Sequence, residues 1–288
     1  MRLIYSYAGL TLVIWCTAFV GCKKAVPPPI TTVVVTTAAT APADPGDAAW
    51  DAAPEFVAKL ILQDLVEPRQ MSVSTPEVRV RAIRSDKELS FRLEWDDATQ
   101  NDVADPGKFC DACAVQLPQK FGPTVPAPQM GETAGGVEIA YWNAAWQAVV
   151  DGRGDSIRDI YPRAAVDHYP FQAQSLEKGS AAQRAMEARY APARALGNNL
   201  AGPRSTPVQD LIAEGPGTIA PAKSSASKGR GQRTETGWAV VITRLLPAGL
   251  RATPNPQVAF AVWEGGRSEV GARKMRTAWL TMTIEEAP

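Results

Sequence analysis

Apolar and polar residues alternate with a period of two in several short runs after Trp50. Residues 78–82 alternate Val with Arg, and residues 89–95 alternate again beyond the turn residues Ser85, Asp86 and Lys87. Alternation of this kind is typical of strands with one buried and one wet side, so the pair predicts a β-hairpin. Further apolar runs predict strands at residues 112–117, 137–143, 238–246, 258–263 and 277–284.

Many short strands separated by turns favour a mainly β fold, an antiparallel β-sandwich with a few short helices. Residues 180–191 are the best helix candidate, and Ser180 is suited to the N-cap. Residues 151–236 form a long polar stretch rich in Gly and Pro, which predicts an irregular insertion. Such an insertion is either functional, for instance in binding a partner, or a plain variable surface segment.

The N-terminus has the pattern of an export signal rather than of a folded domain. Arg2 precedes an apolar run over residues 3–20, which ends at Gly21 and Cys22. A small residue before Cys resembles a bacterial lipoprotein signal over residues 1–22, in which a lipid on Cys22 holds the mature protein at a membrane. An ordinary cleaved signal peptide and an uncleaved anchor helix are the alternatives.

A segment rich in Pro, Thr and Ala follows at residues 23–48 and carries no charge between Lys24 and Asp44. It buries too little apolar area to fold alone, which predicts a tether. The β propensity of residues 30–37 leaves room for a short ordered piece. The folded domain is expected over residues 49–288.

The charge and motif content excludes several function classes. Thirty basic residues balance 30 acidic ones, whereas nucleic-acid binders usually carry a basic excess. The chain has no HExxH motif, phosphate-binding Gly loop or serine nucleophile elbow. Its single histidine, His168, excludes ligation of a metal by two histidines of this chain and is most simply a loop residue.

The segment 257–279 has the most informative pattern in the chain. A strand at 258–263 leads to the turn residues Gly265 and Gly266, and Lys274 stands just ahead of a second strand. This segment resembles the haem-binding γ subunits of the type II dimethyl sulfoxide reductase family, which serve ethylbenzene, dimethyl sulfide, selenate and chlorate oxidoreductases. Further similar blocks lie, in the same order as in that family, at residues 50–54, 89–97, 111–118, 129–131, 137–142 and 229–244.

The resemblance implies a sandwich that holds a non-covalent haem b in a pocket, with Met130 and Lys274 as the axial ligands of the iron. Met130 lies in a loop beside Gly131 rather than in an apolar stripe, which suits a ligand better than a core residue. Without the resemblance, Lys274 between Arg273 and Arg276 would indicate only a solvated face. Met275 is a rival ligand, but in a strand it would point away from the face of Lys274.

The resemblance also implies a role in electron transfer rather than catalysis, because two protein ligands leave the iron no open position. The expected partners are an iron–sulfur subunit paired with a molybdopterin catalytic subunit, and a periplasmic cytochrome c or a quinone-linked carrier. The expected location is the periplasm or cell envelope, on a lipid anchor. The alternatives are a non-haem, carbohydrate-like binding sandwich and a structural lipoprotein.

Two further cysteines, Cys110 and Cys113, form a C-D-A-C sequence. Covalent haem attachment needs His directly after the second Cys, and Ala114 stands there. A disulfide between Cys110 and Cys113 is consistent with an exported protein. Cys16 should leave with the signal peptide.

Overall fold

A computed structural model of the chain describes residues 31–154, 156–165, 176–177, 179–190, 192–196, 198 and 204–285. The predicted signal segment with Cys16 and Cys22 lies outside the described residues, as does His168. Within the described part, no helix is long and apolar enough to cross a membrane.

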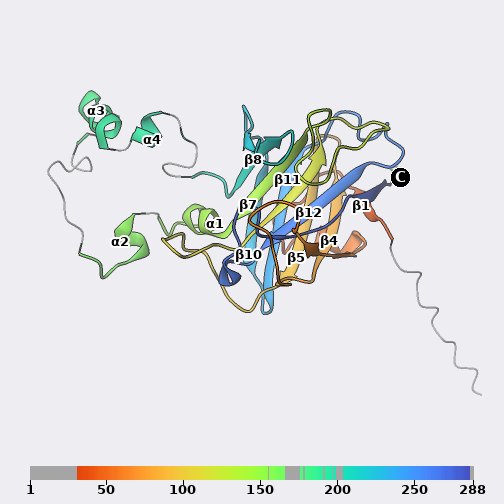
Figure 1. Cartoon of the computed structure of the whole chain (residues 1–288), viewed down its shortest axis with the longest axis horizontal. Helices are drawn as coiled ribbons and strands as arrows, with labels where there is room; N and C mark the ends of the chain where they lie inside the picture. The colour runs from red at the N-terminus through yellow and green to blue at the C-terminus, as the bar shows by residue number, and fades with distance from the viewer. Residues whose placement is uncertain are drawn as a thin grey trace, which may run out of the picture.

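The described chain is mainly β, as predicted, and its strands join edge to edge into two facing layers (Figure 1). The first layer contains, in spatial order, β10 (Lys228–Arg233), β11 (Gly237–Leu245), β5 (Glu88–Asp96), β4 (Glu77–Arg84), β1 (Val33–Thr37) and β14 (Leu280–Ile284), with β2 (Phe56–Lys59) also on β4. The second layer contains β12 (Gln257–Trp263), β6 (Ala112–Pro118), β7 (Val137–Asn143), β8 (Val208–Ala213) and β9 (Ala220–Pro221), with β13 (Met275–Arg276) between β12 and β3 (Ile61–Leu62). Pairing of β14 with β12 connects the two layers.

The predicted strands are confirmed, including the hairpin of β4 and β5, in which Val80 pairs with Leu93, although the last strand begins at Leu280 rather than at residue 277. Three strands of the described part fall inside the stretch 151–236 that we expected to be irregular, namely β8, the two-residue β9 and β10. The sequence of β10 hides its strand because Gly229 and Gly231 break any apolar alternation. Both glycines are needed there, since a Cβ on Gly231 would lie 2.2 Å from the Trp142 ring and one on Gly229 would lie 2.5 Å from Val208.

Helices are short and mostly peripheral, as expected. The α-helices are α1 (Ala144–Val150), α2 (Ile157–Ile160), α3 (Ala181–Tyr190) and α4 (Pro192–Ala195), and the 3-10 helices include η1 (Ala48–Ala52) and η3 (Gly265–Arg267). The predicted helix corresponds to α3, and the Ser180 Oγ caps it by accepting a hydrogen bond from the Gln183 N–H at 3.1 Å. In Figure 1, α2, α3 and α4 lie to one side of the two layers rather than upon them.

The expectation of a tether up to residue 48 is wrong for the part that the structure describes. The strand β1 inserts between β4 and β14 and pairs in parallel with both, so the sheet is mixed rather than purely antiparallel. Val33 and Val35 of β1 are fully buried. The β propensity of residues 30–37 therefore reflects an integral strand of the first layer.

The main core lies between the layers and is built from large aromatic side chains. Phe91 of β5 meets Phe260 of β12 edge to face, with 5.7 Å between ring centroids. Trp142 of β7 lies in edge-to-face contact with both Trp95 of β5 and Trp238 of β11. These contacts join strands that are not neighbours in the sheet, so they fasten one layer to the other.

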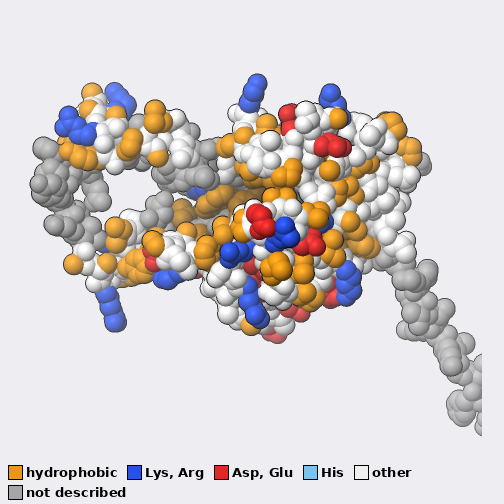
Figure 2. Space-filling model, in the orientation of Figure 1, with side chains coloured by type: hydrophobic (Ala, Val, Ile, Leu, Met, Phe, Trp, Pro, Cys, Tyr) orange, Lys and Arg blue, Asp and Glu red, His pale blue; other side chains and the backbone are white. Residues whose placement is uncertain are grey.

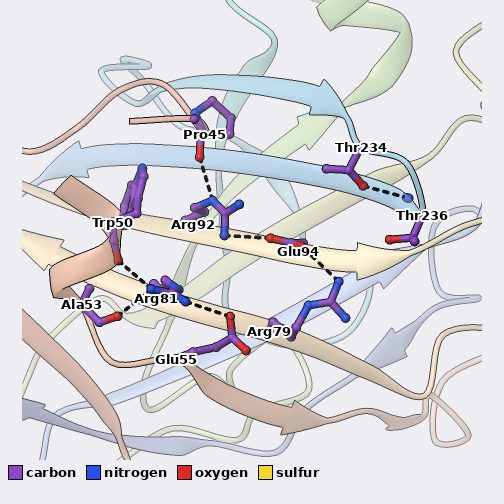
Figure 3. A network of polar contacts seen from close by, with 12 residues as sticks. Pro45, Trp50, Ala53, Glu55, Arg79, Arg81, Arg92, Glu94, Thr234 and Thr236 are labelled. Atoms are coloured by element: carbon purple, nitrogen blue, oxygen red, sulfur yellow. Dashed lines mark hydrogen bonds and ion pairs between the residues drawn. The ribbon is translucent and has the colours of Figure 1, made fainter. Parts of the chain in front are cut away.

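The outer face of the first layer is charged and carries the N-terminal segment (Figure 3). Arg81 donates to the carbonyls of Trp50 and Ala53, and Arg92 donates to the carbonyl of Pro45. Glu94 lies between Arg92 and Arg79 and pairs with both. On the molecular face in Figure 2, acidic and basic side chains are interspersed, without an extended field of one sign.

Candidate functional site: a covered cavity on the outer face of the second layer

The outer face of the second layer is apolar, and it carries a second, smaller hydrophobic cluster. Along β12, Val258, Phe260 and Val262 belong to the core between the layers, whereas Ala261 and Trp263 belong to or pack against the outer cluster. This period of two is the normal property of a strand. A sheet face of this kind needs a cover, which loops provide here.

Between the sheet and these loops lies a cavity of about 420 Å³, a size typical of small-molecule and cofactor sites. Small side chains make its floor: Ala261 pairs with Ala114 across β12 and β6, and Ala259 lies next in the same direction. Tyr141 and Trp263 stand beside this floor in edge-to-face contact, 5.3 Å between ring centroids. The alanines leave room above the sheet, and the aromatic rings supply apolar walls.

Met130 lines this cavity from the loop between β6 and β7. Its φ is +70°, a left-handed conformation that is uncommon for a residue other than glycine and costs about 1 kcal/mol. Strain of this kind is found mostly where a side chain must be presented in one direction.

The loop that carries Met130 is held at several points. The Met130 carbonyl accepts from the Gly215 N–H at 2.8 Å, and the next residue, Gly131, donates to the Ala127 carbonyl at 2.9 Å. The amide of Gln116 donates to the Pro128 carbonyl, and the Trp279 indole donates to that of Pro126. The sulfur-bearing side chain therefore belongs to a fixed part of the cavity wall.

Lys274 lines the same cavity from the residue just before β13, so the structure brings the two predicted ligands together. Its Nζ lies 4.9 Å from the centroid of the Trp263 ring, and no hydrogen bond or ion pair reaches it from the described residues. Although the cavity leaves part of the side chain open, protein atoms surround the ammonium closely. Burial lowers the pKa of Lys274 to about 8, and the nearby charge of Arg276 contributes in the same direction.

The neighbours of Lys274 alternate as expected for extended chain. Met275 is completely buried in the core between the layers and does not line the cavity. Arg276 lines the cavity on the same side as Lys274. The rival ligand Met275 therefore faces away from this site.

The resemblance implied a pocket of the sandwich without saying where it lies, and the cavity is not in the core between the layers. The site lies instead on the outer side of the second layer, under the loops at residues 63–67, 128–130 and 216–219. One signal of this was present in β6, whose residues are all apolar or small apart from Gln116, and which is buried on both faces. A strand buried on both faces requires a cover on each side.

Sequence reasoning missed Gln63, which holds the segment that carries Lys274. Its side-chain amide donates to the carbonyls of Ala272 at 3.0 Å and Val66 at 2.7 Å, and its side-chain oxygen accepts from two backbone N–H groups. Its own backbone N–H donates to the Lys274 carbonyl at 3.2 Å. A lone Gln after a short strand gives no such signal in sequence, because its partner segment lies about 200 residues away.

Glu269 provides a second set of hydrogen bonds that hold the segment carrying Lys274. It is 1% exposed and accepts hydrogen bonds from the Gln70 side chain and the Glu264 backbone. Burial raises the pKa of its carboxyl above the ordinary value. Residues 63–70 and 264–274 are therefore bound to each other at both ends of the loop pair.

Cys110 and Cys113 are free thiols, so the disulfide considered for them is not formed in this structure. Cys113 points into the core between the layers, whereas Cys110 precedes β6 and is partly exposed. Burial raises the pKa of both thiols, that of Cys110 to about 11. Neither thiol lines the cavity, so the described residues offer no thiol there for covalent attachment of a cofactor.

Asp111 is a second buried group that the sequence did not reveal. Its carboxylate accepts from the N–H groups of Asn101 and Gly265 and from the Trp238 indole, at 2.8 to 3.0 Å. Burial raises its pKa to about 6. Because Asp111 connects the two layers and does not line the cavity, its role is structural.

The donor set of the cavity suits a metal that accepts sulfur and neutral nitrogen. Within the described residues, no group of three or more His, Cys, Asp or Glu side chains is arranged to hold a metal ion. A thioether and an amine on one cavity are instead compatible with the two axial positions of a haem iron, whose other four positions are filled by the macrocycle. The apolar walls suit such a macrocycle.

Comparison with known proteins gives consistent matches along most of the chain. The family model described as ethylbenzene dehydrogenase matches residues 47–275. A Haloferax mediterranei protein, assigned by its name as the respiratory nitrate reductase heme subunit ORF7, is 24% identical over 254 residues, covering 86% of this chain and 70% of that protein. The chlorate reductase subunit gamma of Ideonella dechloratans is 24% identical over 238 residues, and the match covers 79% of this chain and 73% of that subunit.

Among solved structures, a family 9 carbohydrate-binding module of Caldicellulosiruptor kristjanssonii, in complex with cellotriose, is similar with a TM-score of 0.44. It shares 8% identity, and the match covers 88% of this chain and 94% of the module. A likeness this remote carries no argument about a ligand.

Proposed function

Because the chain belongs to the ethylbenzene dehydrogenase family, we propose that it is a haem b-binding, electron-transfer subunit of a multi-subunit oxidoreductase. Met130 and Lys274 are the proposed axial ligands. The observation that carries the proposal is that these two side chains, 144 positions apart in sequence, line one covered apolar cavity. The names of the two relatives, a heme subunit and a subunit gamma of reductases, support it.

When bound, a haem with two protein ligands supplies one-electron transfer and leaves no iron position for a substrate. Met130 would provide the sulfur from a loop whose backbone is already held in place. A side chain on a backbone held in this way would lose little conformational freedom on binding the group. A thioether also favours the reduced iron.

Lys274 would provide the second donor, which requires its neutral amine. With a pKa of about 8, roughly a tenth of this side chain is already neutral at pH 7, compared with less than one part in a thousand for an ordinary lysine. Burial of Lys274 therefore lowers the free-energy cost of forming the neutral amine that would bind the metal.

The proposed haem is non-covalent, because Cys113 faces the core between the layers and Cys110 does not line the cavity. The proposed partners are an iron–sulfur subunit with a molybdopterin catalytic subunit on one side, and a periplasmic cytochrome c on the other. We further propose an extracytoplasmic location with a lipid anchor at Cys22, which rests on the signal-like sequence before the described residues.

The test is a visible absorption spectrum of the exported domain, oxidised and dithionite-reduced, after supply of iron protoporphyrin IX. We expect a sharp reduced low-spin b-type spectrum from the unmodified protein. Met130→Leu and Lys274→Leu should each lose it and give a high-spin spectrum. Met275→Leu is the matched control, because it changes the neighbouring methionine in the core and should keep the low-spin spectrum.

A folded protein that stays colourless with haem supplied would contradict the proposed function. A low-spin spectrum that survives the double substitution Met130→Leu, Lys274→Leu would contradict the assigned ligands.

A further inference from the structure

Arg276 is a buried cation that has no acidic partner in the described part of the chain. It is 8% exposed and lines the cavity two residues after Lys274. One Nη donates to the Thr277 carbonyl at 3.2 Å, and the Nε has no hydrogen-bond partner. Burial lowers the pKa of its guanidinium, and the charge of the exposed Asp64 opposes this shift without coming within ion-pair distance.

The other polar residues around the cavity do not supply a counter-charge. Glu67 is the one acidic residue among the described cavity-lining residues, and its exposed carboxylate pairs with Arg69 at 2.8 Å. Lys274 adds a second cation to the same wall. Among the described residues, no carboxylate lies within ion-pair distance of this guanidinium, and the more distant charge of Asp64 compensates it only in part.

The cavity therefore combines an apolar floor with one cationic wall. In the register of the sheet, Arg276 is opposite Ala261, which is opposite Ala114, which is opposite Tyr141. This row leads from a guanidinium across two alanines to an aromatic ring. A ligand that fits it has a flat apolar body and an acidic group at one edge.

We propose that Arg276 binds a carboxylate of the cavity's ligand, which for a haem would be a propionate. This inference rests on the proposed function. The planar fork of an arginine matches a carboxylate with two parallel hydrogen bonds, which a lysine does not reproduce. The Cα atoms of Arg276 and Lys274 are roughly 7 Å apart along the extended chain, so both cationic side chains belong to the same wall of the cavity.

The test compares two ligands that differ only in their acidic groups: iron protoporphyrin IX and its dimethyl ester. Affinities are measured by absorption titration on the unmodified protein, Arg276→Gln and Arg276→Lys. The unmodified protein should bind the free acid roughly ten to a hundred times more tightly than the ester, the range for a hydrogen bond between charged groups. Arg276→Gln should lose this preference by weakening binding of the free acid alone, and Arg276→Lys should recover part of it.

Arg273→Gln is the matched control, because it removes an exposed arginine that does not line the cavity. It should keep the affinity and the preference of the unmodified protein. In all variants that bind, the low-spin spectrum should remain, since Met130 and Lys274 are unchanged.

An Arg276→Gln variant with unchanged affinity and unchanged preference for the free acid would overturn this inference while leaving the proposed function intact. If Arg276→Gln does not fold, the unmodified protein still decides, since equal affinity for acid and ester would overturn the inference. Absence of haem binding by the unmodified protein would instead overturn the proposed function, and this inference with it.

Discussion

At the scale of single residues, the cavity concentrates features that cost stability. A left-handed methionine, a lysine without an anionic partner and a guanidinium with an unpaired Nε all line it. The large interior side chains elsewhere follow the ordinary rule and pack in an apolar core between the layers. Several locally unfavourable features in one place are typical of a binding site, because interactions with a ligand offset their free-energy cost.

Lys274 should make the stability of the haem-free protein rise with pH. Its pKa is about 8 in the folded protein and near 10.5 when unfolded, so between these values the unfolded chain binds the extra proton. The cost of burying the charge is present in full below pH 8 and disappears above pH 10.5. The difference corresponds to roughly 3 kcal/mol.

Urea unfolding of the haem-free protein and of Lys274→Leu measures this effect, because other titrating groups cancel in the comparison. The variant should be more stable by up to about 3 kcal/mol at pH 7, and the advantage should shrink toward pH 10.5. A difference independent of pH would show that the lysine is charged and solvated in the fold.

Gly131 should tolerate no side chain, because it follows Met130 in a tight loop. Its φ is +76°, and a Cβ there would lie 2.8 Å from the Gly135 carbonyl oxygen. We expect Gly131→Ala to cost about 2–4 kcal/mol, the sum of left-handed strain and crowding, and to displace Met130. Thermal unfolding and haem affinity are the measurements.

Gly107→Ala is the matched control for this prediction, with a φ of +75° and no atom within 4 Å of the added Cβ. It should cost only about 1 kcal/mol, the strain alone. Equal effects of the two substitutions would mean that the loop before β7 has room to move.

At the scale of elements, the sequence predicts strands well where apolar residues alternate with polar ones or run together, as in β11, and poorly where glycines interrupt the pattern, as in β10. Val78 to Ala82 alternates because its arginines face solvent and the N-terminal segment. The strand β10 was missed because its glycines serve the close approach of Trp142 and Val208, a requirement set by strands distant in sequence.

The residues of the candidate site also differ in how far the local sequence reveals their roles. The ligand pair Met130 and Lys274 came from resemblance, and no local pattern distinguishes Lys274 from a surface lysine. Gln63 and Arg276 gain their roles only from the tertiary fold, since one bonds a segment about 200 residues away and the other faces a floor made by two other strands. Such relations are properties of register and packing, which local sequence does not encode.

Gln63 should act as a positioning residue for Lys274. Gln63→Ala would leave partly buried backbone groups of residues 65, 66 and 272 without their partner, at a cost of about 1–3 kcal/mol. It should also weaken haem binding while keeping the low-spin spectrum at saturation. Gln100→Ala is the control, because Gln100 is exposed and bonds only Asp102, and it should change stability by less than about 0.5 kcal/mol.

At the scale of the whole molecule, the two layers differ in their outer faces. The first layer presents arginines that hold the N-terminal segment and pair with glutamates, as Figure 3 shows, while the second presents an apolar face under loops. With 30 charges of each sign, the molecule has no net field to attract a polyanion. The difference between the two outer faces, rather than the overall charge, identifies the second layer as the side that carries the candidate site.

The strand β1 links the first layer to the strand that joins the second, because it lies between β4 and β14. Val35 is fully buried opposite Ala82 and Ile284, whereas Val34 is only partly buried. Val35→Thr places an unpaired hydroxyl in the core and should cost about 1–3 kcal/mol, while Val34→Thr, the same change one residue earlier, should cost less than about 0.5 kcal/mol. Urea unfolding measures both, and equal small effects would mean that β1 is a detachable part of the N-terminal segment rather than a strand on which the two layers depend.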